Sequence, residues 1–321
     1  MKNNIINHLV FYCGNVKKND KVFLIYDLST KKIYNKFKNF LDKKKINFES
    51  ALSKKTQNHG NNLGKKIGDM MNKNDVTFCL TKNSFAHSKE RLISENKGKR
   101  FLSLVNYNSK KIDYNSILAP FKKYSLKAKR LEKILNKSRN IKIITDNGTI
   151  LTAETQNRKA NFCPGYVNNK ILLGSPPDVE TNISPIENRS NGTIEIDGSI
   201  STESIGKLNN NRIKLNIKKG QITKFETKNK SLNKKFAKLF FKKNKKRRIL
   251  AEIGFGFNKK SKITGHMLCD EGAYGCVHFG FGSNFTVGGK NKINFHVDMI
   301  IKNPTVYIDN KIILKNYKYK I

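Results

Sequence analysis

The sequence lacks the long apolar run that a membrane-spanning helix or a secretory signal requires. It contains no stretch of 18 apolar residues, and its first twenty residues carry only short apolar runs. The five cysteines are odd in number and include no Cys-x-x-Cys pair, which argues against a disulfide framework. No glycine-rich phosphate loop follows an expected strand, so a nucleotide site is not supported. These absences predict a cytoplasmic protein without a membrane partner.

Arginine is also scarce, since only 9 of the 64 basic residues are Arg. A formal net charge of +40 ordinarily suggests nucleic-acid binding. Proteins that read nucleic acid favour Arg for its bidentate hydrogen bonds, whereas here Lys and Asn are spread along the whole chain. A coding bias explains that spread without selection for binding. We therefore expect a solvated, lysine-rich surface, including the run from Lys242 to Arg248, and no nucleic-acid partner.

The length of 321 residues predicts two domains, and residues 1–140 have the pattern of the first. Apolar runs alternate there with segments in which apolar residues recur at helical spacing, as in Ile33, Phe37 and Leu41. Ser84 is the expected N-cap of one of these helices. The alternation predicts a parallel α/β sheet. The expected elements include strands at Lys21–Leu28, Val76–Thr81 and Arg100–Val105, and a long helix from about Asn115 to Lys137.

Residues 141–321 have a β-rich pattern. Asn147-Gly148 lies between two β-like runs and predicts a hairpin, and further turns are expected at Lys219-Gly220 and Asp309-Asn310. One helix is expected from about Leu232 to Lys243. The predicted fold class is therefore α/β, with an N-terminal parallel α/β domain followed by a β-rich α+β metal-binding domain.

The metal prediction begins with a segment that has no basic residue. Between Ile263 and Gly289 there is no Lys or Arg, although 27 residues of this chain should hold about five. Imidazoles and carboxylates among glycines, in a region without cations, are what a divalent-metal site requires. A buried glycine-rich core is the alternative explanation. The residues of interest are His266, Asp270, Glu271 and His278, flanked by Glu252, His296 and Asp298.

Two further patterns support a metal site. If the segment around His296-Val297-Asp298 is a strand, both polar side chains leave the same face. A second cation-poor stretch, from Ile171 to Gly206, carries Asp178, Glu180 and Glu187 close to prolines that favour a rigid loop. A histidine in a strand is most often an ordinary core or surface residue, but two with adjacent carboxylates favour zinc, manganese, cobalt or iron.

The order of these segments resembles the thermophilic-type metallo-aminopeptidase family (aminopeptidase T and S, peptidase family M29) and its dihydroxypyridine dioxygenase relatives. The resemblance runs from about Phe85 to the C-terminus. The residues that carry it are Gly148-Thr149-Ile150-Leu151, Arg158, Pro177-Asp178-Val179-Glu180, Pro185, Asn191-Gly192, Ala251-Glu252-Ile253-Gly254, Asp270-Glu271 with Gly275 and His278, and His296-Val297-Asp298.

The resemblance implies Glu180, Glu252, His278, His296 and Asp298 as metal ligands, and Glu180 or Glu252 as the catalytic base. It favours a hydrolase that removes N-terminal residues from peptides with a metal-activated water, and a homodimer. Zn, Co or Mn would then be the cofactor. A tyrosine ligand of the aminopeptidases is Phe285 here, which leaves open whether one metal binds or two. The alternative is a mononuclear Fe(II) dioxygenase with a small-molecule substrate, which uses only His278, His296 and Asp298.

Overall fold

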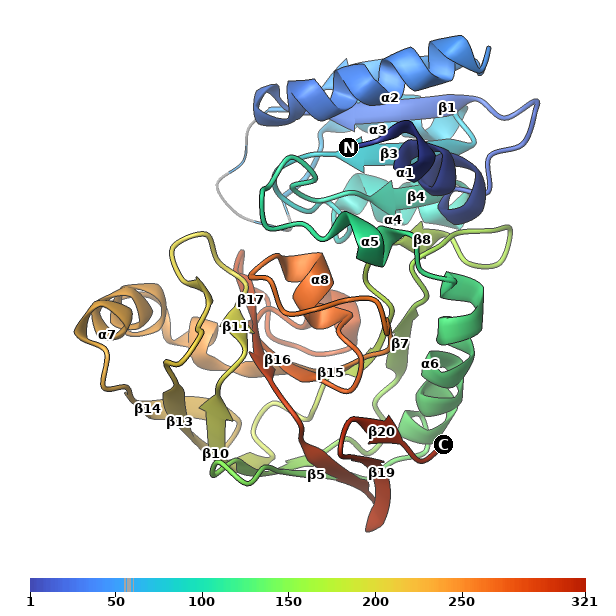
Figure 1. The fold of residues 1–321 in the computed structure, drawn as a ribbon. Helices are drawn as coiled ribbons and strands as arrows, with labels where there is room; N and C mark the ends of the chain where they lie inside the picture. The colour runs from blue at the N-terminus through green and yellow to red at the C-terminus, as the bar shows by residue number, and fades with distance from the viewer. Residues whose placement is uncertain (55, 57–58, 60) are drawn as a thin grey trace. The chain divides into compact units, whose positions relative to one another are not determined.

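A computed structural model describes residues 1–54, 56, 59 and 61–321. The chain forms two compact units (Figure 1). One comprises Met1–Lys123 and Cys163–Pro177, and the other comprises Tyr124–Phe162 and Asp178–Ile321. A parallel α/β sheet lies in the first and large antiparallel sheets lie in the second, so the predicted fold class is confirmed. The expected domain boundary at residue 140 stays a prediction.

A five-stranded parallel sheet organises the first unit. The first of its strands in the sequence, VFLIY, is an apolar run that is almost entirely buried, as expected when both faces of a parallel sheet are covered. The strands are β1 (Val22–Tyr26), β2 (Phe48–Leu52), β3 (Val76–Leu80), β4 (Arg100–Ser103) and β8 (Leu173–Gly174). Their order in the sheet is β2-β1-β3-β4-β8.

Helices contact both faces of this sheet. Phe37 of helix α2 (Lys31–Lys43) packs on Phe78 of β3, with ring centroids 5.8 Å apart. A cluster that includes Phe23 and Phe101 packs with Met71 of helix α3 (Lys65–Lys73). Alternate side chains of each strand leave opposite faces, which produces these two apolar layers. The other helices of the unit are α1 (Asn3–Asn7), η1 (His8–Cys13), η2 (Leu28–Thr30), α4 (Lys89–Asn96) and α5 (Tyr114–Ile117).

Two helix boundaries differ from the sequence prediction. The N-cap of α4 is Ser88, whose side chain accepts a hydrogen bond from the Arg91 N–H; the Ser84 hydroxyl instead accepts one from Ala86. The long helix predicted from about Asn115 is broken into α5 and helix α6 (Phe121–Leu135). Pro120 explains the break, because proline disfavours a helical backbone at the residue before it and cannot donate a helical hydrogen bond.

The second unit contains two antiparallel sheets. The eight-stranded sheet has the order β14-β13-β10-β6-β5-β18-β19-β20, and the seven-stranded sheet has the order β12-β11-β17-β16-β15-β9-β7. The strands of the first are β5 (Asn140–Ile144), β6 (Ile150–Glu154), β10 (Ser190–Ile196), β13 (Ile213–Lys218), β14 (Gln221–Glu226), β18 (Thr305–Ile308), β19 (Lys311–Lys315) and β20 (Lys318–Tyr319). Those of the second are β7 (Ala160–Cys163), β9 (Glu180–Ile183), β11 (Ser199–Ile200), β12 (Gly206–Lys207), β15 (Leu250–Gly256), β16 (Val277–Gly282) and β17 (His296–Ile301).

The predicted turns and helix of this unit are present. Strands β5 and β6 pair around Asn147-Gly148, and β18 and β19 pair around Asp309-Asn310, whose φ angles of 45° and 67° are typical of tight hairpins.

Among the described residues, no helix has both the length and the apolar character needed to cross a membrane. Besides most of α6, the helices of the unit are α7 (Lys230–Phe236), η3 (Ala237–Phe241), η4 (Lys245–Arg248), α8 (Met267–Glu271) and η5 (Phe285–Val287).

Candidate metal centre

One face of the seven-stranded sheet brings together the residues that the resemblance implies as metal ligands. Four adjacent strands supply them, in the order β17-β16-β15-β9. Side chains at paired positions of neighbouring strands leave the same face, and so do residues two apart on one strand. The ligand-type residues are Glu180 on β9, Glu252 on β15, His278 on β16, and His296 and Asp298 on β17. The residues between them, such as Ile253, Phe279 and Met299, are fully buried and apolar.

Two glycines, Gly254 and Gly280, leave space on this face for the imidazole rings of His278 and His296. Gly254 pairs with His278, and Gly280 pairs with both Glu252 and Asp298. A Cβ atom at Gly254 would lie 1.9 Å from the His278 Nε2 atom, and one at Gly280 would lie 2.7 Å from the His296 ring. The glycine-rich composition seen in the sequence therefore has a local cause, since each ring occupies the space that a neighbouring side chain would fill.

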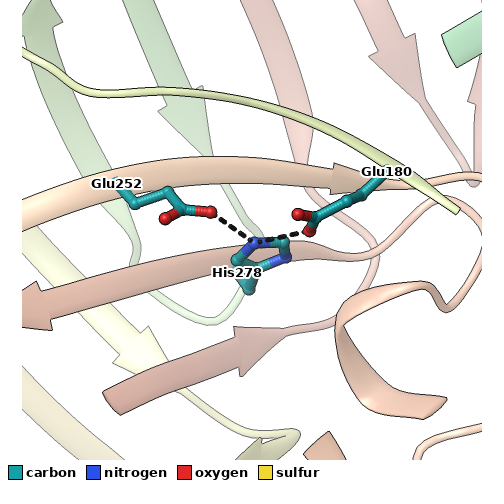
Figure 2. A group of neighbouring side chains, drawn as sticks. All are labelled: Glu180, Glu252 and His278. Atoms are coloured by element: carbon teal, nitrogen blue, oxygen red, sulfur yellow. Dashed lines mark hydrogen bonds and ion pairs between the residues drawn. The ribbon is translucent and has the colours of Figure 1, made fainter. Parts of the chain in front are cut away.

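The His278 ring lies between two carboxylates (Figure 2). Its Nε2 atom is 3.1 Å from Glu180 Oε2 and 3.4 Å from Glu252 Oε1. The three side chains are buried, and one ligand-type atom from each lies within 4.8 Å of the others. This group could hold a metal ion.

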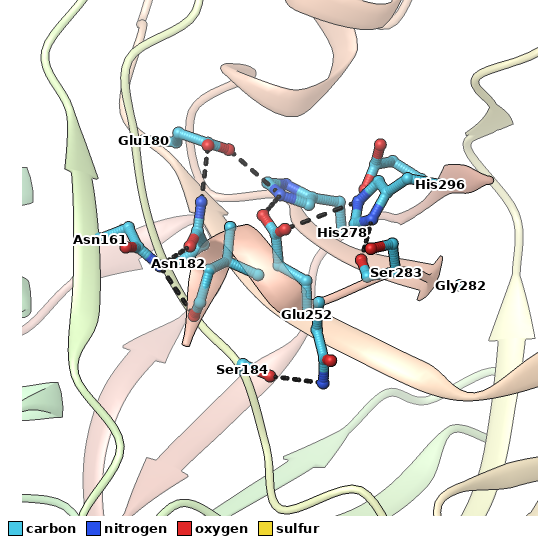
Figure 3. A network of polar contacts seen from close by, with 12 residues as sticks. Asn161, Glu180, Asn182, Ser184, Glu252, His278, Gly282, Ser283 and His296 are labelled. Atoms are coloured by element: carbon cyan, nitrogen blue, oxygen red, sulfur yellow. Dashed lines mark hydrogen bonds and ion pairs between the residues drawn. The ribbon is translucent and has the colours of Figure 1, made fainter. Parts of the chain in front are cut away.

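A second group shares Glu252 with the first. The His296 Nε2 atom is 3.1 Å from Asp298 Oδ1 and 3.5 Å from Glu252 Oε2. On the other side of the ring, Nδ1 lies 2.8 Å from the Ser283 carbonyl oxygen (Figure 3). If Nδ1 donates its proton to that carbonyl, Nε2 is the ligand nitrogen, which is the usual arrangement of a metal-binding histidine. The His296 side chain is 26% exposed, so this group is open to solvent on the His296 side.

The surrounding groups determine the charge of this cluster. Burial lowers the pKa of His278, but Glu180, Glu252 and Asp298 outweigh burial and raise it well above the ordinary value. Burial likewise opposes the shift at His296, where Asp298 and Glu252 raise the pKa to about 10. Burial alone would raise the pKa of Asp298, yet the two imidazoles hold it below its usual range. In the absence of another cation, protons on the imidazoles therefore balance the carboxylates.

The residues fit a divalent cation. Within the described part of the chain, no Lys or Arg forms an ion pair with any of the three carboxylates. Buried carboxylates that face one another are costly unless a positive charge lies between them. Imidazole nitrogens with carboxylate oxygens are donors that suit zinc, manganese, cobalt or iron.

Glu271 is a site residue to which the sequence analysis assigned no role. It ends α8, it is buried, and its carboxyl group lies near that of Asp298. Burial and the nearby carboxylates of Asp298, Glu180 and Asp178 raise the pKa of Glu271 well above its usual range, although His278 opposes them. A carboxyl group that keeps its proton can donate to the Asp298 carboxylate. Its sequence signals were its position in the cation-free segment and its place in the Asp270-Glu271 element of the resemblance, neither of which indicated a role.

Other polar residues of the cation-poor segments lie outside both groups. Asp270 accepts hydrogen bonds from the Ser199 hydroxyl at 2.6 Å and from the Thr264 N–H at 2.7 Å, so it supports the turn before α8. Glu187 pairs with Arg158 at 2.5 Å and anchors a loop. His266 is buried at the N-cap position of α8. These residues are structural, although they share the composition of the site.

Phe285 also lies outside the two groups. It begins η5, its side chain is 56% exposed, and the Lys292 Nζ atom lies 5.1 Å from its ring centroid. A phenyl ring has no ligand atom. The position at which the aminopeptidases have a tyrosine ligand therefore contributes nothing to this centre.

The raised pKa values predict that metal binding displaces protons. At pH 7 the His296 imidazole, with a pKa of about 10, carries a proton in the metal-free protein, and the carboxylates that raise the pKa of His278 favour a proton there as well. A metal ligand must be deprotonated, so binding should release about two protons and should weaken as the pH falls. Calorimetric titration with Mn²⁺ in buffers of different ionisation enthalpy measures the number released. Binding without proton release would contradict these protonation states.

Residues 18–319 match the family model of NicX, 2,5-dihydroxypyridine 5,6-dioxygenase. No curated protein sequence matches the chain. The solved structure of the 2,5-dihydroxypyridine dioxygenase from Pseudomonas putida KT2440 is similar, with a TM-score of 0.79 and 18% sequence identity, over 99% of this chain and 96% of that one.

Wild-type AmpT from Thermus thermophilus is similar as well. Its TM-score is 0.70 at 10% sequence identity, over 99% of this chain and 98% of that one. At such identities the two structures show a shared fold, whereas the family match extends over nearly the whole sequence. Both relatives named from the sequence are thus confirmed. The chain belongs to the NicX family, whose description is 2,5-dihydroxypyridine 5,6-dioxygenase.

Proposed function

We propose that the protein is an Fe(II)-dependent dioxygenase that opens a dihydroxylated nitrogen-containing ring of the 2,5-dihydroxypyridine type. The observation that carries the proposal is the family match over residues 18–319. The family is described by that reaction, and the two histidines and the aspartate that would hold an iron lie on neighbouring strands of one sheet. The hydrolase favoured by the sequence alone is therefore the second candidate.

His278, His296 and Asp298 would hold the iron. Two histidines and one carboxylate are the usual ligand set of mononuclear Fe(II) oxygenases, and they leave positions open for other molecules. Bound Fe(II) would supply the redox chemistry with O₂ that none of the twenty side chains offers. The Ser283 carbonyl fixes the orientation of the His296 ring, and the buried sheet face keeps water from most of the site.

Glu252 is the candidate for proton transfer. Its two carboxylate oxygens lie 3.4 Å from His278 Nε2 and 3.5 Å from His296 Nε2. Burial raises the pKa of Glu252, although the two imidazoles oppose the shift, so its carboxylate is a better proton acceptor than an exposed one. A ring hydroxyl that binds beside the imidazoles would give its proton to a Glu252 oxygen.

A metallo-aminopeptidase remains the second candidate because of one specific observation. Glu252 belongs to both three-residue groups, which is how a carboxylate shared by two metal ions would lie. The absence of a ligand atom at Phe285 weakens this candidate, since one of the two positions would lack a protein ligand. The homodimer and the cytoplasmic location expected from the sequence remain predictions.

Metal content and oxygen uptake separate the two candidates. We expect the protein, prepared without oxygen and loaded with Fe(II), to bind about one iron per chain and to consume O₂ when 2,5-dihydroxypyridine is added. Protein loaded with Zn²⁺, which has no redox chemistry, is the matched control and should consume none. Binding of about two Zn²⁺ per chain, with release of N-terminal residues from peptides, would instead favour the aminopeptidase.

A further inference from the structure

Asn182 lies beside Glu180 on the ligand face of β9. The two residues are two positions apart on the strand, and both are buried. The Asn182 Nδ2 atom donates a hydrogen bond of 2.8 Å to Glu180 Oε1 (Figure 3). The other oxygen of Glu180, Oε2, faces His278 Nε2 at 3.1 Å. One oxygen of the carboxylate is therefore occupied by an amide, and the other is directed into the metal centre.

Asn161 determines which way the Asn182 amide points. Asn161 is on β7, the strand next to β9, and its Nδ2 atom donates to Asn182 Oδ1 at 2.9 Å. With its oxygen accepting from Asn161, the Asn182 amide presents its NH₂ group to Glu180. The reverse orientation would set two oxygens against each other at Glu180 and two NH₂ groups against each other at Asn161.

The Asn161 side chain also reaches the loop that follows β16. Its Nδ2 atom lies 3.3 Å from the Val287 carbonyl oxygen. The same loop contains Ser283, whose carbonyl orients His296. Asn161 thus connects Asn182, which donates to Glu180, to the loop whose Ser283 carbonyl orients His296.

We propose that Asn182, held in orientation by Asn161, is a positioning residue that presents Glu180 to the metal centre through a single oxygen. This inference rests on the metal site of the proposed function and assigns Glu180 a role in it beside the two histidines and Asp298. An amide donor fixes the position of Glu180 Oε1 and leaves Oε2 for the cation. Residues that orient metal ligands in this way commonly change metal affinity when they are replaced.

Thr181 provides a matched control on the same strand. Its side chain lies on the opposite face of β9 and donates a buried hydrogen bond of 2.7 Å to the Ala128 carbonyl. Thr181→Val removes one buried hydrogen bond of the same strand, whereas Asn182→Ala removes two, and the Thr181 bond does not touch the metal centre. A loss of metal affinity caused only by general destabilisation would appear in both variants.

The test is titration of the purified full-length protein with Co²⁺, followed by its visible absorption, together with thermal unfolding of the metal-free forms. We expect Asn182→Ala to weaken Co²⁺ binding by about 10- to 100-fold and to change the Co²⁺ spectrum. Asn161→Ala should act in the same direction with a smaller effect, and it tests the same contact without a change in β9. Thr181→Val should bind Co²⁺ as the wild type does.

The double variant tests whether the two residues act as one unit. If Asn161 acts through Asn182, the double variant should bind Co²⁺ about as weakly as Asn182→Ala alone, whereas independent effects would multiply. Wild-type affinity and spectrum in Asn182→Ala would overturn the inference, and so would equal losses in Thr181→Val. Failure of the proposed reaction is a separate outcome: the wild type would bind Co²⁺, with the variants ranked as expected, yet the Fe(II) form would consume no O₂.

Discussion

Replacement of His296 by alanine should remove metal binding at the group formed by Glu252, His296 and Asp298, and with it the activity. The change deletes the Nε2 atom that lies 3.1 Å from Asp298 and 3.5 Å from Glu252. Two carboxylates without an imidazole are a poorer site for iron or zinc. The metal-free protein should also lose stability, because the protonated imidazole no longer balances the buried carboxylates of Asp298 and Glu252. Metal content after dialysis and thermal unfolding with and without Mn²⁺ measure both effects.

The increase in the free energy of unfolding that a bound ion produces is the most direct measure of metal binding in this variant. A ligand present at 100 times its dissociation constant stabilises a protein by about 2.7 kcal/mol, and that increment should disappear in His296→Ala if the protein binds a single ion. Replacement of His87, an exposed histidine of the first unit, is the matched control and should leave the increment unchanged. Unchanged metal content in His296→Ala would show that the centre is placed wrongly.

The pair of histidine variants also distinguishes one metal from two. If a single ion is held by His278, His296 and Asp298, then His278→Ala and His296→Ala should each abolish binding. If each three-residue group holds its own ion, each variant should retain about one ion per chain, because the other histidine still lies beside Glu252. Elemental analysis of both variants therefore bears directly on the choice between dioxygenase and aminopeptidase.

Local sequence patterns were sufficient to predict much of the fold. Apolar runs separated by helical spacing predicted the parallel sheet, and Asn147-Gly148 and Asp309-Asn310 predicted hairpins that the structure contains. The spacing of His296 and Asp298 placed both on one strand face, and their side chains are in contact. The break at Pro120 was predictable in the same way, because proline restricts the residue before it. It was missed because helical spacing continues on both sides of it.

The remaining geometry of the site depends on pairing between strands that are far apart in the sequence, and no local sequence pattern predicts that pairing. Glu180 and Glu252 approach the same imidazole only because β9 pairs with β15, although the two strands are far apart in the sequence. The resemblance implied that these residues are metal ligands, but it did not give the distances between them. Asn161 gave no signal at all, since an amide among many asparagines of a lysine- and asparagine-rich chain is not distinctive until β7 is placed beside β9.

Gly254→Ala is expected to damage the centre as severely as the loss of a ligand. The new methyl group would lie 1.9 Å from His278 Nε2 and 2.1 Å from Cε1, which no side-chain adjustment of Gly254 itself can relieve. The ring must leave its place between Glu180 and Glu252, or β15 and β16 must separate. Overpacking of this kind costs about 1–3 kcal/mol, and in a unit of this size each kcal/mol lowers the melting temperature by about 2–4 °C. Thermal unfolding and Co²⁺ titration measure the two consequences.

Gly68→Ala is the matched control for this prediction. Gly68 lies in helix α3, where the added Cβ would lie 2.9 Å from Glu90 Cγ and 3.2 Å from Glu90 Cβ, so this site is also overpacked but touches no metal-ligand residue. The variant should lose some stability to the same kind of crowding and yet bind Co²⁺ normally. Normal Co²⁺ binding in Gly254→Ala would contradict the packing of His278 against this glycine. The His278 ring occupies space that is free only because Gly254 has no side chain, so Gly254 is as necessary to the centre as the histidine.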